Sequence, residues 1–307
     1  MSYKKRICLF AAYDNNNIVH DYVVYYIKEL SKFADIYYLA ECNMPQRELD
    51  KLKPYVMEAY AYKHGKYDFG SWQELIYKIG WKRLSQYDEL ILANDSCFAP
   101  VFPLEPIFEK ATLSNCDFWG ITEGHLNNLH IQSYFMVLNK KCFTSKVFKD
   151  FISSVTVLNK EQLIDKYESR LTALLTDNGF VCKKLLNGSI GAYDKYITML
   201  RLKNPFIKKL SFTEKDKYHL RQSLVNWEKY FNKYTNYDIN LIKNYLKSEN
   251  LPDTFFKSNQ YKKQAFKYNL KALCKWIFEV RLSKKHTLVR FFGITIADKY
   301  KNSIDAF

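Results

Sequence analysis

The residues best placed to perform chemistry follow a short apolar run at positions 89–93. Directly after it stand Asn94, Asp95 and Ser96. In open α/β sheets, ligands bind beyond the carboxyl ends of the strands, so polar residues in this position are candidates for a binding site. A carboxylate there can hold a Mg²⁺ or Mn²⁺ ion that bridges two phosphates, because Mg²⁺ takes hard oxygen ligands and receives few of them from protein. The alternative is that these residues serve only the geometry of a strand-to-loop turn.

Two other polar segments suit the binding of a nucleotide. Asp14 follows the first apolar run of the chain, at a strand end where a base or ribose would be held, and Asn17 after it could instead be a helix cap. Asp68 and Gly70 precede an expected helix. Glycine lets the backbone approach a ligand closely, and a helix N-terminus offers free N–H groups to a phosphate. A structural turn is the alternative for Asp68.

Glu168 is a carboxylate within an apolar stripe, because Ile164, Leu171 and Leu175 share its face at helical spacing. Burial of a charged carboxylate costs free energy unless a partner or a function compensates for it. Desolvation would raise the pKa of this carboxyl toward the range that is useful to a general base. The alternative is a salt bridge to Arg170 or to a more distant lysine.

Four residues in or beside a loop form a second group of candidates, which suit the binding of an acceptor: Glu123, His125, His130 and Gln132. The two histidines are also alternative bases. The sequence has no histidine or cysteine cluster with zinc spacing, no phosphate-binding loop motif and no serine-hydrolase elbow. Zinc, phosphate-loop and hydrolase chemistries therefore lack support.

Alternating strands and helices must position these residues. Strands are expected at residues 6–13, 35–40, 56–62, 89–93, 117–122 and 132–138. Helical spacing runs from Val19 to Phe33 and over residues 160–177, and Ser71 with Glu74 forms a capping box that predicts a helix start at Ser71. The alternation predicts an α/β fold with a mainly parallel sheet.

The pattern changes after Pro205. Residues 214–250 suggest polar, aromatic-rich helices, and residues 261–283 a basic helix. We therefore expect a nucleotide-binding α/β domain over residues 1–210 and a helical, basic C-terminal region over residues 211–307.

Charge and cysteine content limit the partners and the compartment. The net charge is +15, and residues 261–301 hold eleven Lys or Arg and two acids, a net charge of +9. A basic end rich in Phe, Trp and Leu favours an anionic surface over nucleic acid, which a uniformly basic coat would suggest. The seven cysteines are scattered without a C-x-x-C pair, which is typical of a reduced, cytoplasmic protein. No signal peptide or spanning segment is expected, so membrane contact would be peripheral.

Five blocks, in order, resemble the rhamnan synthesis F family of bacterial glycosyltransferases. They are residues 67–72 (YDFGSW), 87–96 (YDELILANDS), 117–122 (DFWGIT), 130–135 (HIQSYF) and 204–208 (NPFIK). The resemblance spans roughly residues 5–210 and implies a GT-A-like fold, with an acidic motif after a central strand. Asn94-Asp95-Ser96 stands in that place. One carboxylate replaces the usual Asp-x-Asp pair, so the resemblance implies a divalent cation at Asp95 only with help from other oxygens.

The resemblance also implies a reaction. It is transfer of a deoxyhexose, typically L-rhamnose from dTDP-rhamnose, to a lipid-linked cell-surface polysaccharide such as O-antigen, by direct displacement that inverts the anomeric carbon. Lys208 and Lys184 are candidates to neutralise the departing diphosphate. Residues 167–180 are similar to the Glu-Asp-containing helix of inverting family-2 glycosyltransferases. Ser169 replaces the Asp, so the base role is assigned to Glu168.

The basic C-terminal helix is the expected contact with the inner membrane surface. Its apolar stripe would consist of Phe266, Leu270, Leu273, Ile277 and Val280. Lysines on its other faces would each contribute about 1 kcal/mol at an anionic leaflet. The alternative is that the stripe packs on the catalytic domain. Two other functions stay open, a non-catalytic scaffold for polysaccharide assembly and, with less support, a nucleic-acid-binding protein.

Overall fold

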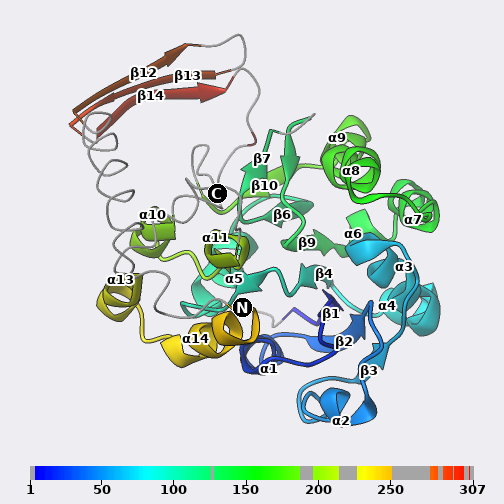
Figure 1. Ribbon diagram of the computed structural model, residues 1–307. Helices are drawn as coiled ribbons and strands as arrows, with labels where there is room; N and C mark the ends of the chain where they lie inside the picture. Colours follow the sequence, from blue (N-terminus) through cyan, green and yellow to red (C-terminus); the bar gives the residue numbers. More distant parts are fainter. Residues whose placement is uncertain are drawn as a thin grey trace.

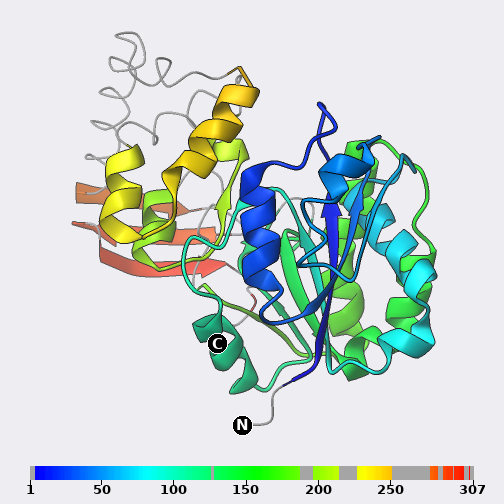
Figure 2. The ribbon, with the colours of Figure 1, turned by 90° about the horizontal axis from the view of Figure 1, so that it is seen from below.

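The structure, a computed structural model, is an α/β fold in which helices cover both faces of a seven-stranded sheet (Figure 1). It describes residues 4–125, 128–186, 196–213, 227–250, 277–282, 286–292, 294–300 and 304. Figure 2 shows the blue helix α1 and the yellow helices α13 and α14 on one side of the sheet.

The central sheet is mixed but mainly parallel. Its strands lie in the order β10 (Cys182–Lys184), β6 (Phe118–Gly120), β9 (Phe135–Asn139), β4 (Glu89–Asn94), β1 (Arg6–Ala12), β2 (Asp35–Ala40) and β3 (Glu58–Ala61). Neighbouring strands are parallel except at β9, which runs antiparallel to both β4 and β6. The predicted α/β fold with a mainly parallel sheet is confirmed.

The two central strands, β1 and β4, are buried along their whole length. This is typical of strands that are covered on both faces. Cys8 and Phe10 face one hydrophobic core and Ile7 and Leu9 face the other, because successive side chains of a strand point to opposite faces. A polar site can therefore form only beyond the ends of these strands.

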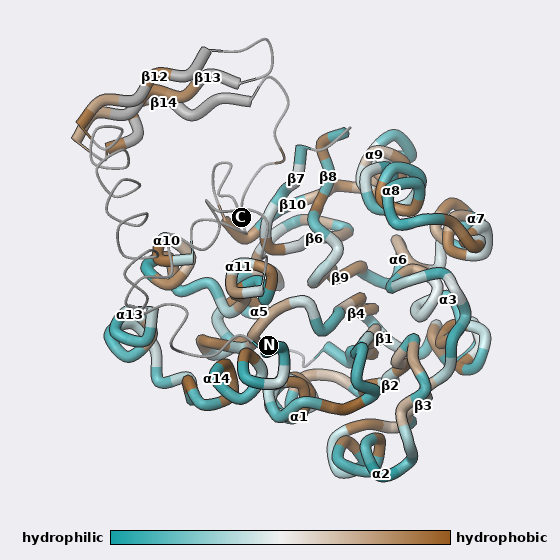
Figure 3. Tube along the Cα trace, in the orientation of Figure 1, coloured by the Kyte–Doolittle hydropathy of each residue, from teal (hydrophilic) through white to brown (hydrophobic). Residues whose placement is uncertain are grey.

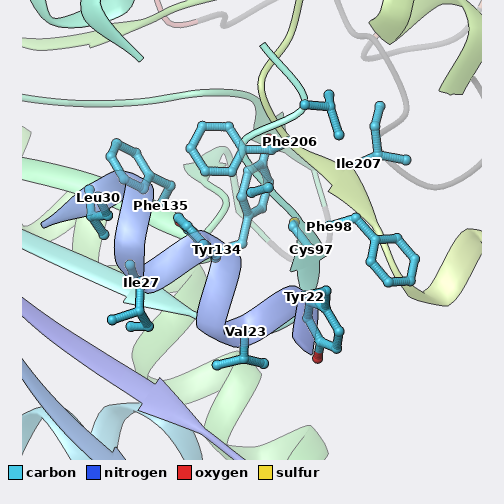
Figure 4. Close-up of a cluster of buried hydrophobic side chains, with 14 of the residues drawn as sticks. Tyr22, Val23, Ile27, Leu30, Cys97, Phe98, Tyr134, Phe135, Phe206 and Ile207 are labelled. Atoms are coloured by element: carbon cyan, nitrogen blue, oxygen red, sulfur yellow. The ribbon is translucent and has the colours of Figure 1, made fainter. Parts of the chain in front are cut away.

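Helices from distant parts of the chain cover one face of the sheet. They are α1 (Asp21–Leu30), α5 (Glu105–Thr112), α10 (Tyr196–Arg201), α13 (Trp227–Tyr234) and α14 (Ile239–Ser248). Figure 4 shows α1 side chains such as Tyr22 and Ile27 in one cluster with Phe98, Phe206 and Ile207. The same core takes in residues from both sides of position 210, and the domain boundary near 210 remains a prediction.

The other face is covered by a second set of helices: α3 (Tyr67–Ile79), α4 (Trp81–Leu84), α6 (Lys140–Phe143), α7 (Lys146–Ser153), α8 (Lys160–Leu163) and α9 (Ser169–Asp177). A further helix, α2 (Gln46–Leu49), contacts the edge strand β3. Helices α7 and α9 alternate between hydrophobic and hydrophilic segments (Figure 3), as expected for helices with one face on a core. No helix in the described part of the chain is long and apolar enough to cross a membrane.

The predicted helix start at Ser71 is wrong, and Asn17, for which a helix cap was the alternative, is not a cap. Helix α3 begins at Tyr67, so Ser71 lies inside it and bonds the His64 ring through its hydroxyl instead of capping a terminus. Helix α1 follows His20, and Asn17 is a loop residue with a φ of 57° whose amide oxygen accepts from the Asn43 N–H. Local capping rules assign both polar side chains to a helix N-terminus. Each of them instead forms a hydrogen bond with another residue, Ser71 with His64 and Asn17 with Asn43.

The C-terminal region also differs from the prediction. Three antiparallel strands form a separate sheet: β12 (Phe278–Leu282), β13 (His286–Phe291) and β14 (Ile294–Tyr300). The predicted basic helix is therefore wrong over Phe278–Leu282, and residues 261–276 of it lie outside the described residues. Alternating apolar residues at 278, 280 and 282 also fit the period of a strand. Helices α13 and α14 confirm the helical prediction where the structure describes residues 214–250.

Candidate functional site

A cavity of about 860 Å³ opens at the carboxyl ends of β1 and β4. These strands are parallel neighbours, so the residues that follow them meet at one edge of the sheet. The volume suits a small-molecule ligand. The lining brings together seven of the predicted site residues: Asp14, Asp68, Asn94, Asp95, Ser96, Glu168 and Lys208. A second cavity, of about 800 Å³, is lined by residues of α1, of the segment 100–107 and of the end of α13, and by none of these seven.

Asn94 holds the loop after β4 against the start of α3. Its side chain is almost fully buried, with 3% of the residue exposed. The amide nitrogen donates to Asp68 Oδ2 at 2.7 Å, and the amide oxygen accepts from the backbone N–H of Ser96 at 3.1 Å and from its hydroxyl at 2.6 Å. This one amide therefore sets the positions of both Asp68 and Ser96 at the cavity.

Asp68 is the acid whose protonation is most strongly changed by its surroundings. Burial, followed by the negative charges of Asp95 and Glu168, raises its pKa to about 7, against the opposing effects of Lys208 and the Asn94 hydrogen bond. A carboxyl with such a pKa can exchange a proton near neutral pH. The sequence prediction placed Asp68 in donor binding and missed this property, because the acids that cause it are distant in the chain.

Asp95 is paired with Lys209, which the sequence prediction missed. The distance from Asp95 Oδ2 to Lys209 Nζ is 3.2 Å. Lys209 also donates to the Tyr22 hydroxyl at 2.5 Å, and its ammonium lies 5.0 and 5.1 Å from the ring centres of Tyr22 and Tyr245. The one available signal was its place beside Lys208 in a pair of lysines.

A short two-stranded sheet brings the two lysines to the cavity. Strand β11 (Ile207–Lys208) pairs antiparallel with β5 (Cys97–Phe98). Lys208 Nζ donates to the Ser96 hydroxyl at 2.9 Å and lies 4.5 Å from the Tyr134 ring centre. The backbone N–H of Lys209 donates to the Ser96 carbonyl at 2.9 Å. Two ammonium groups are thus held beside the loop after β4.

Glu168 enters the cavity from a π-helical segment, Ile164–Glu168, between α8 and α9. One of its oxygens accepts from the Ser133 hydroxyl at 2.8 Å and from the Ser133 N–H at 3.2 Å. Single π-helical turns occur frequently at functional sites. The predicted apolar stripe is present at Leu171 and Leu175, but Glu168 itself is only half-buried and takes Ser133 as its partner.

Asp14 organises the loop after β1. Burial opposes its ionisation, but hydrogen bonds from His20 and from the N–H groups of Ile18 and Asn16 hold its pKa below the ordinary value. The carboxylate is therefore charged and engaged within its own loop. Its predicted role in donor binding stays a prediction.

Gly70 lies inside α3 and is not among the residues that line the cavity. A Cβ atom at this position would overlap Lys66 Cβ and would lie 2.8 Å from the His64 ring. Close packing against Lys66 and His64 thus accounts for the glycine.

The predicted acceptor residues form a separate cluster around the hairpin of β7 (Glu123–Gly124) and β8 (His130–Ile131). Glu123 pairs with Lys184 at 2.9 Å and with His125 at 3.2 Å, and it accepts from the Ile304 N–H at 3.1 Å. Burial opposes its ionisation, but these partners hold the pKa of Glu123 below its ordinary value. Lys184, a candidate for neutralising diphosphate, is therefore engaged here.

The other two members of this group also have protein partners. His130 is buried against Gly124, and its Nδ1 lies 2.8 Å from the Asn128 carbonyl oxygen. Gln132 accepts from the Thr122 hydroxyl at 2.6 Å. Neither residue lines the cavity, and neither do Glu123 and His125. Their role in acceptor binding stays a prediction.

Comparison with known proteins gives one family and several distant structures. The model of the family described as rhamnan synthesis protein F matches residues 36–284. No curated protein matches the chain.

Three solved structures are similar to part or most of the chain. The glycosyltransferase GlyE of Streptococcus pneumoniae is 14% identical, over 81% of this chain and 64% of that one, with a TM-score of 0.45. A cytidylyltransferase of Leptospira borgpetersenii is 11% identical, over 77% and 99%, with a TM-score of 0.39. A nucleotide-diphospho-sugar transferase, described as putative, from Desulfovibrio desulfuricans is 12% identical, over 74% and 97%, with a TM-score of 0.35. All three TM-scores lie below 0.5, so the functions of these proteins do not carry over to this chain.

Proposed function

This chain belongs to the rhamnan synthesis protein F family, and we propose that it is a glycosyltransferase that binds a nucleotide-sugar donor in the cavity beyond β1 and β4. The observation that carries the proposal is the meeting of separate sequence blocks in one cavity. Asp68 comes from the first block, Asn94-Asp95-Ser96 from the second and Lys208 from the last. Ligands of open α/β sheets bind at this edge.

The arrangement of charges supports a displacement reaction. Lys208 and Lys209 would lie against the diphosphate, where they stabilise the negative charge that grows as the bond from the anomeric carbon to the phosphate oxygen breaks. The electron pair of that bond leaves with the diphosphate. The acceptor hydroxyl oxygen forms the new bond to the anomeric carbon, and its proton passes to a carboxylate.

Glu168 is the proposed base. Its hydrogen bonds to Ser133 fix its orientation, and a positioned carboxylate can take the acceptor proton in the transition state. Asp68 is the rival for this role because its pKa is about 7. One oxygen of Asp68 is held by the Asn94 amide of the loop after β4, so we assign Asp68 to donor binding and the base role to Glu168.

The substrates are proposed from the family. We propose L-rhamnose or another deoxyhexose as the sugar, with dTDP-rhamnose as the donor and a lipid-linked cell-surface glycan such as O-antigen as the acceptor. The description of the family names rhamnan synthesis, which supports this choice of sugar.

Contact with the inner membrane surface, from the cytoplasmic side, is proposed for the C-terminal sheet. Exposed apolar side chains lie on all three strands: Phe278, Val280, Phe291, Ile294 and Ile296. Phe278 stands opposite Phe291, and Phe291 opposite Ile294, so these three share one face. The net charge of +9 over residues 261–301 would attract this segment to anionic lipids.

Thermal shift with dTDP, UDP and GDP, followed by donor hydrolysis assays with the matching rhamnose, glucose and mannose donors, tests the proposal. We expect dTDP to raise the melting temperature and dTDP-rhamnose to be hydrolysed. Stabilisation by none of the nucleotides, with no hydrolysis, would favour the scaffold function instead. Asp238→Asn, a helix cap outside the cavity, is the control variant.

A further inference from the structure

We infer that Lys209 takes the place of a divalent cation at Asp95, so that the donor diphosphate is bound by the two lysines without a metal ion. The inference rests on the proposed function. It concerns how the donor diphosphate is bound. The sequence has one carboxylate after β4 in place of the Asp-x-Asp pair that the family resemblance implies.

The oxygen donors near Asp95 do not fit a metal site. Within the described residues, no group of three or more His, Cys, Asp or Glu could hold a metal ion. The Asn94 amide oxygen already accepts two hydrogen bonds from Ser96, and an Asp68 oxygen accepts from the Asn94 amide nitrogen. Mg²⁺ can bind through one or two carboxylates, with waters and substrate phosphates as its other ligands. A metal ion at Asp95 would therefore compete directly with Lys209, whose ammonium already lies 3.2 Å from Asp95 Oδ2.

The ammonium of Lys209 is built into this position. The side chains of Lys209 and Asp95 are 15% and 14% exposed, so the pair is largely shielded from water. The Tyr22 hydroxyl accepts from the ammonium, and the centre of the Tyr245 ring lies 5.1 Å from it. An aromatic ring attracts a cation. Three protein groups, Asp95, the Tyr22 hydroxyl and the Tyr245 ring, thus hold one positive charge beside the loop after β4 before any donor arrives.

A second lysine completes the arrangement. Lys208 donates a hydrogen bond to the hydroxyl of Ser96, the residue after Asp95. Both lysines line the cavity. Two fixed positive charges can neutralise a diphosphate leaving group as a metal ion would. Asp95 is then a positioning residue, whose role is to orient Lys209.

Binding of dTDP, UDP and GDP by isothermal titration calorimetry, in EDTA and in Mn²⁺, tests the inference. We expect the nucleotide that binds to do so with the same affinity, within threefold, in both conditions. Binding that disappears in EDTA and returns with Mn²⁺ would overturn the inference while leaving the proposed function intact. Binding of none of the three in either condition would overturn both.

Two substitutions separate the roles of the pair. Asp95→Asn should keep nucleotide binding within threefold, because the amide oxygen can still accept from the Lys209 ammonium, whereas a metal ligand at Asp95 would make the same change abolish binding. Lys209→Met should weaken binding at least tenfold in EDTA. Unchanged binding by Lys209→Met, or lost binding by a folded Asp95→Asn, would contradict the inference.

A lysine outside the cavity provides the matched control. Lys51 pairs with Glu48 at 2.6 Å and lies outside the cavity lining, so Lys51→Met should bind as the unchanged protein does. Circular dichroism verifies the fold of each variant. If Lys209→Met does not fold, Asp95→Asn and the comparison of EDTA with Mn²⁺ still decide the question.

Discussion

Two groups of polar and charged side chains lie at the same edge of the central sheet and differ in what surrounds them. The cavity cluster is Asp68, Asn94, Asp95, Ser96, Glu168, Lys208 and Lys209, and the hairpin cluster is Glu123, His125 and Lys184. Strands β4 and β6 both run antiparallel to β9, and β10 runs parallel to β6, so both clusters follow strand ends that point the same way. The rule that ligands bind beyond strand ends selects both clusters equally.

The balance of charge distinguishes them. In the hairpin cluster one carboxylate meets a lysine and a histidine, and the Glu123 and Lys184 side chains are 1% and 2% exposed. In the cavity cluster three carboxylates share two lysines, and the pKa of Asp68 rises where that of Glu123 falls. The hairpin cluster is enclosed with matched partners, whereas the cavity cluster, with its shifted pKa, lines a space that a ligand can enter.

The largest expected effect separates the clusters by activity. Glu168→Gln should lower the rate of sugar transfer by about 10² to 10⁴-fold, because a neutral amide cannot accept the acceptor proton. Steady-state kinetics with dTDP-rhamnose measures it. Glu161→Gln, an exposed acid on α8, should leave the rate unchanged. A loss of less than tenfold in Glu168→Gln would move the base role to Asp68.

The next effect separates the clusters by stability. Glu123→Ala should lower the free energy of unfolding by about 3–5 kcal/mol, because it removes one partner of a buried ion pair. Urea denaturation measures it. Lys141→Ala, which removes a 72% exposed partner of Asp117, should cost less than about 1 kcal/mol. The double variant Glu123→Leu, Lys184→Met should recover most of the loss, and a stable Glu123→Ala protein with altered acceptor affinity would instead place Glu123 in a site.

A smaller effect tests whether Gly70 belongs to the cavity cluster or only to the packing of α3. Gly70→Ala should destabilise the protein by about 1–3 kcal/mol through overlap with Lys66 and His64. Nucleotide affinity, measured by calorimetry below the melting temperature, should not change. A variant of unchanged stability that had lost nucleotide binding would show that the backbone at Gly70 contacts the donor after all.

The smallest effect concerns pH. The pKa of Asp68 in the folded protein, about 7, lies well above the ordinary value of an aspartate, so between these two values the folded protein holds a proton that the unfolded chain releases. The free energy of unfolding should therefore fall as pH rises from about 4 to 7. Asp68→Asn removes this dependence and should gain on the order of 1–2 kcal/mol over the unchanged protein across that window. Urea denaturation at pH 5 and pH 8 measures the gain, and an equal difference at both pH values would refute the assignment.

Local rules were enough to predict much of the cavity cluster. Buried apolar runs identify β1 and β4, and the residues that follow them in the chain, Asp14 and Asn94-Asp95-Ser96, are found at the cavity. The period of the stripe around Glu168 similarly identifies its helix. These features depend on short stretches of chain, in which side-chain spacing reports burial directly.

The remaining features depend on contacts between distant segments. Lys209 reaches Asp95 only because β11 pairs with β5, and Glu123 reaches Lys184 only because β10 pairs with β6. No local pattern records either pairing. The C-terminal strands were missed for another reason, since the apolar residues between Ile277 and Leu282 satisfy both a helical and an alternating period.

The π-helical segment has a consequence for comparing relatives by sequence length. It lies between the Asn159 cap and the stop at Gly179, and it holds more residues per turn than an α-helix would. Removal of one residue, such as the exposed Lys166, would let α8 and α9 join as a regular helix and would turn Glu168 by about 100° relative to one of its flanking helices. A relative one residue shorter in this interval should therefore carry its carboxylate elsewhere, so the number of residues between cap and stop indicates where the Glu168 side chain is placed.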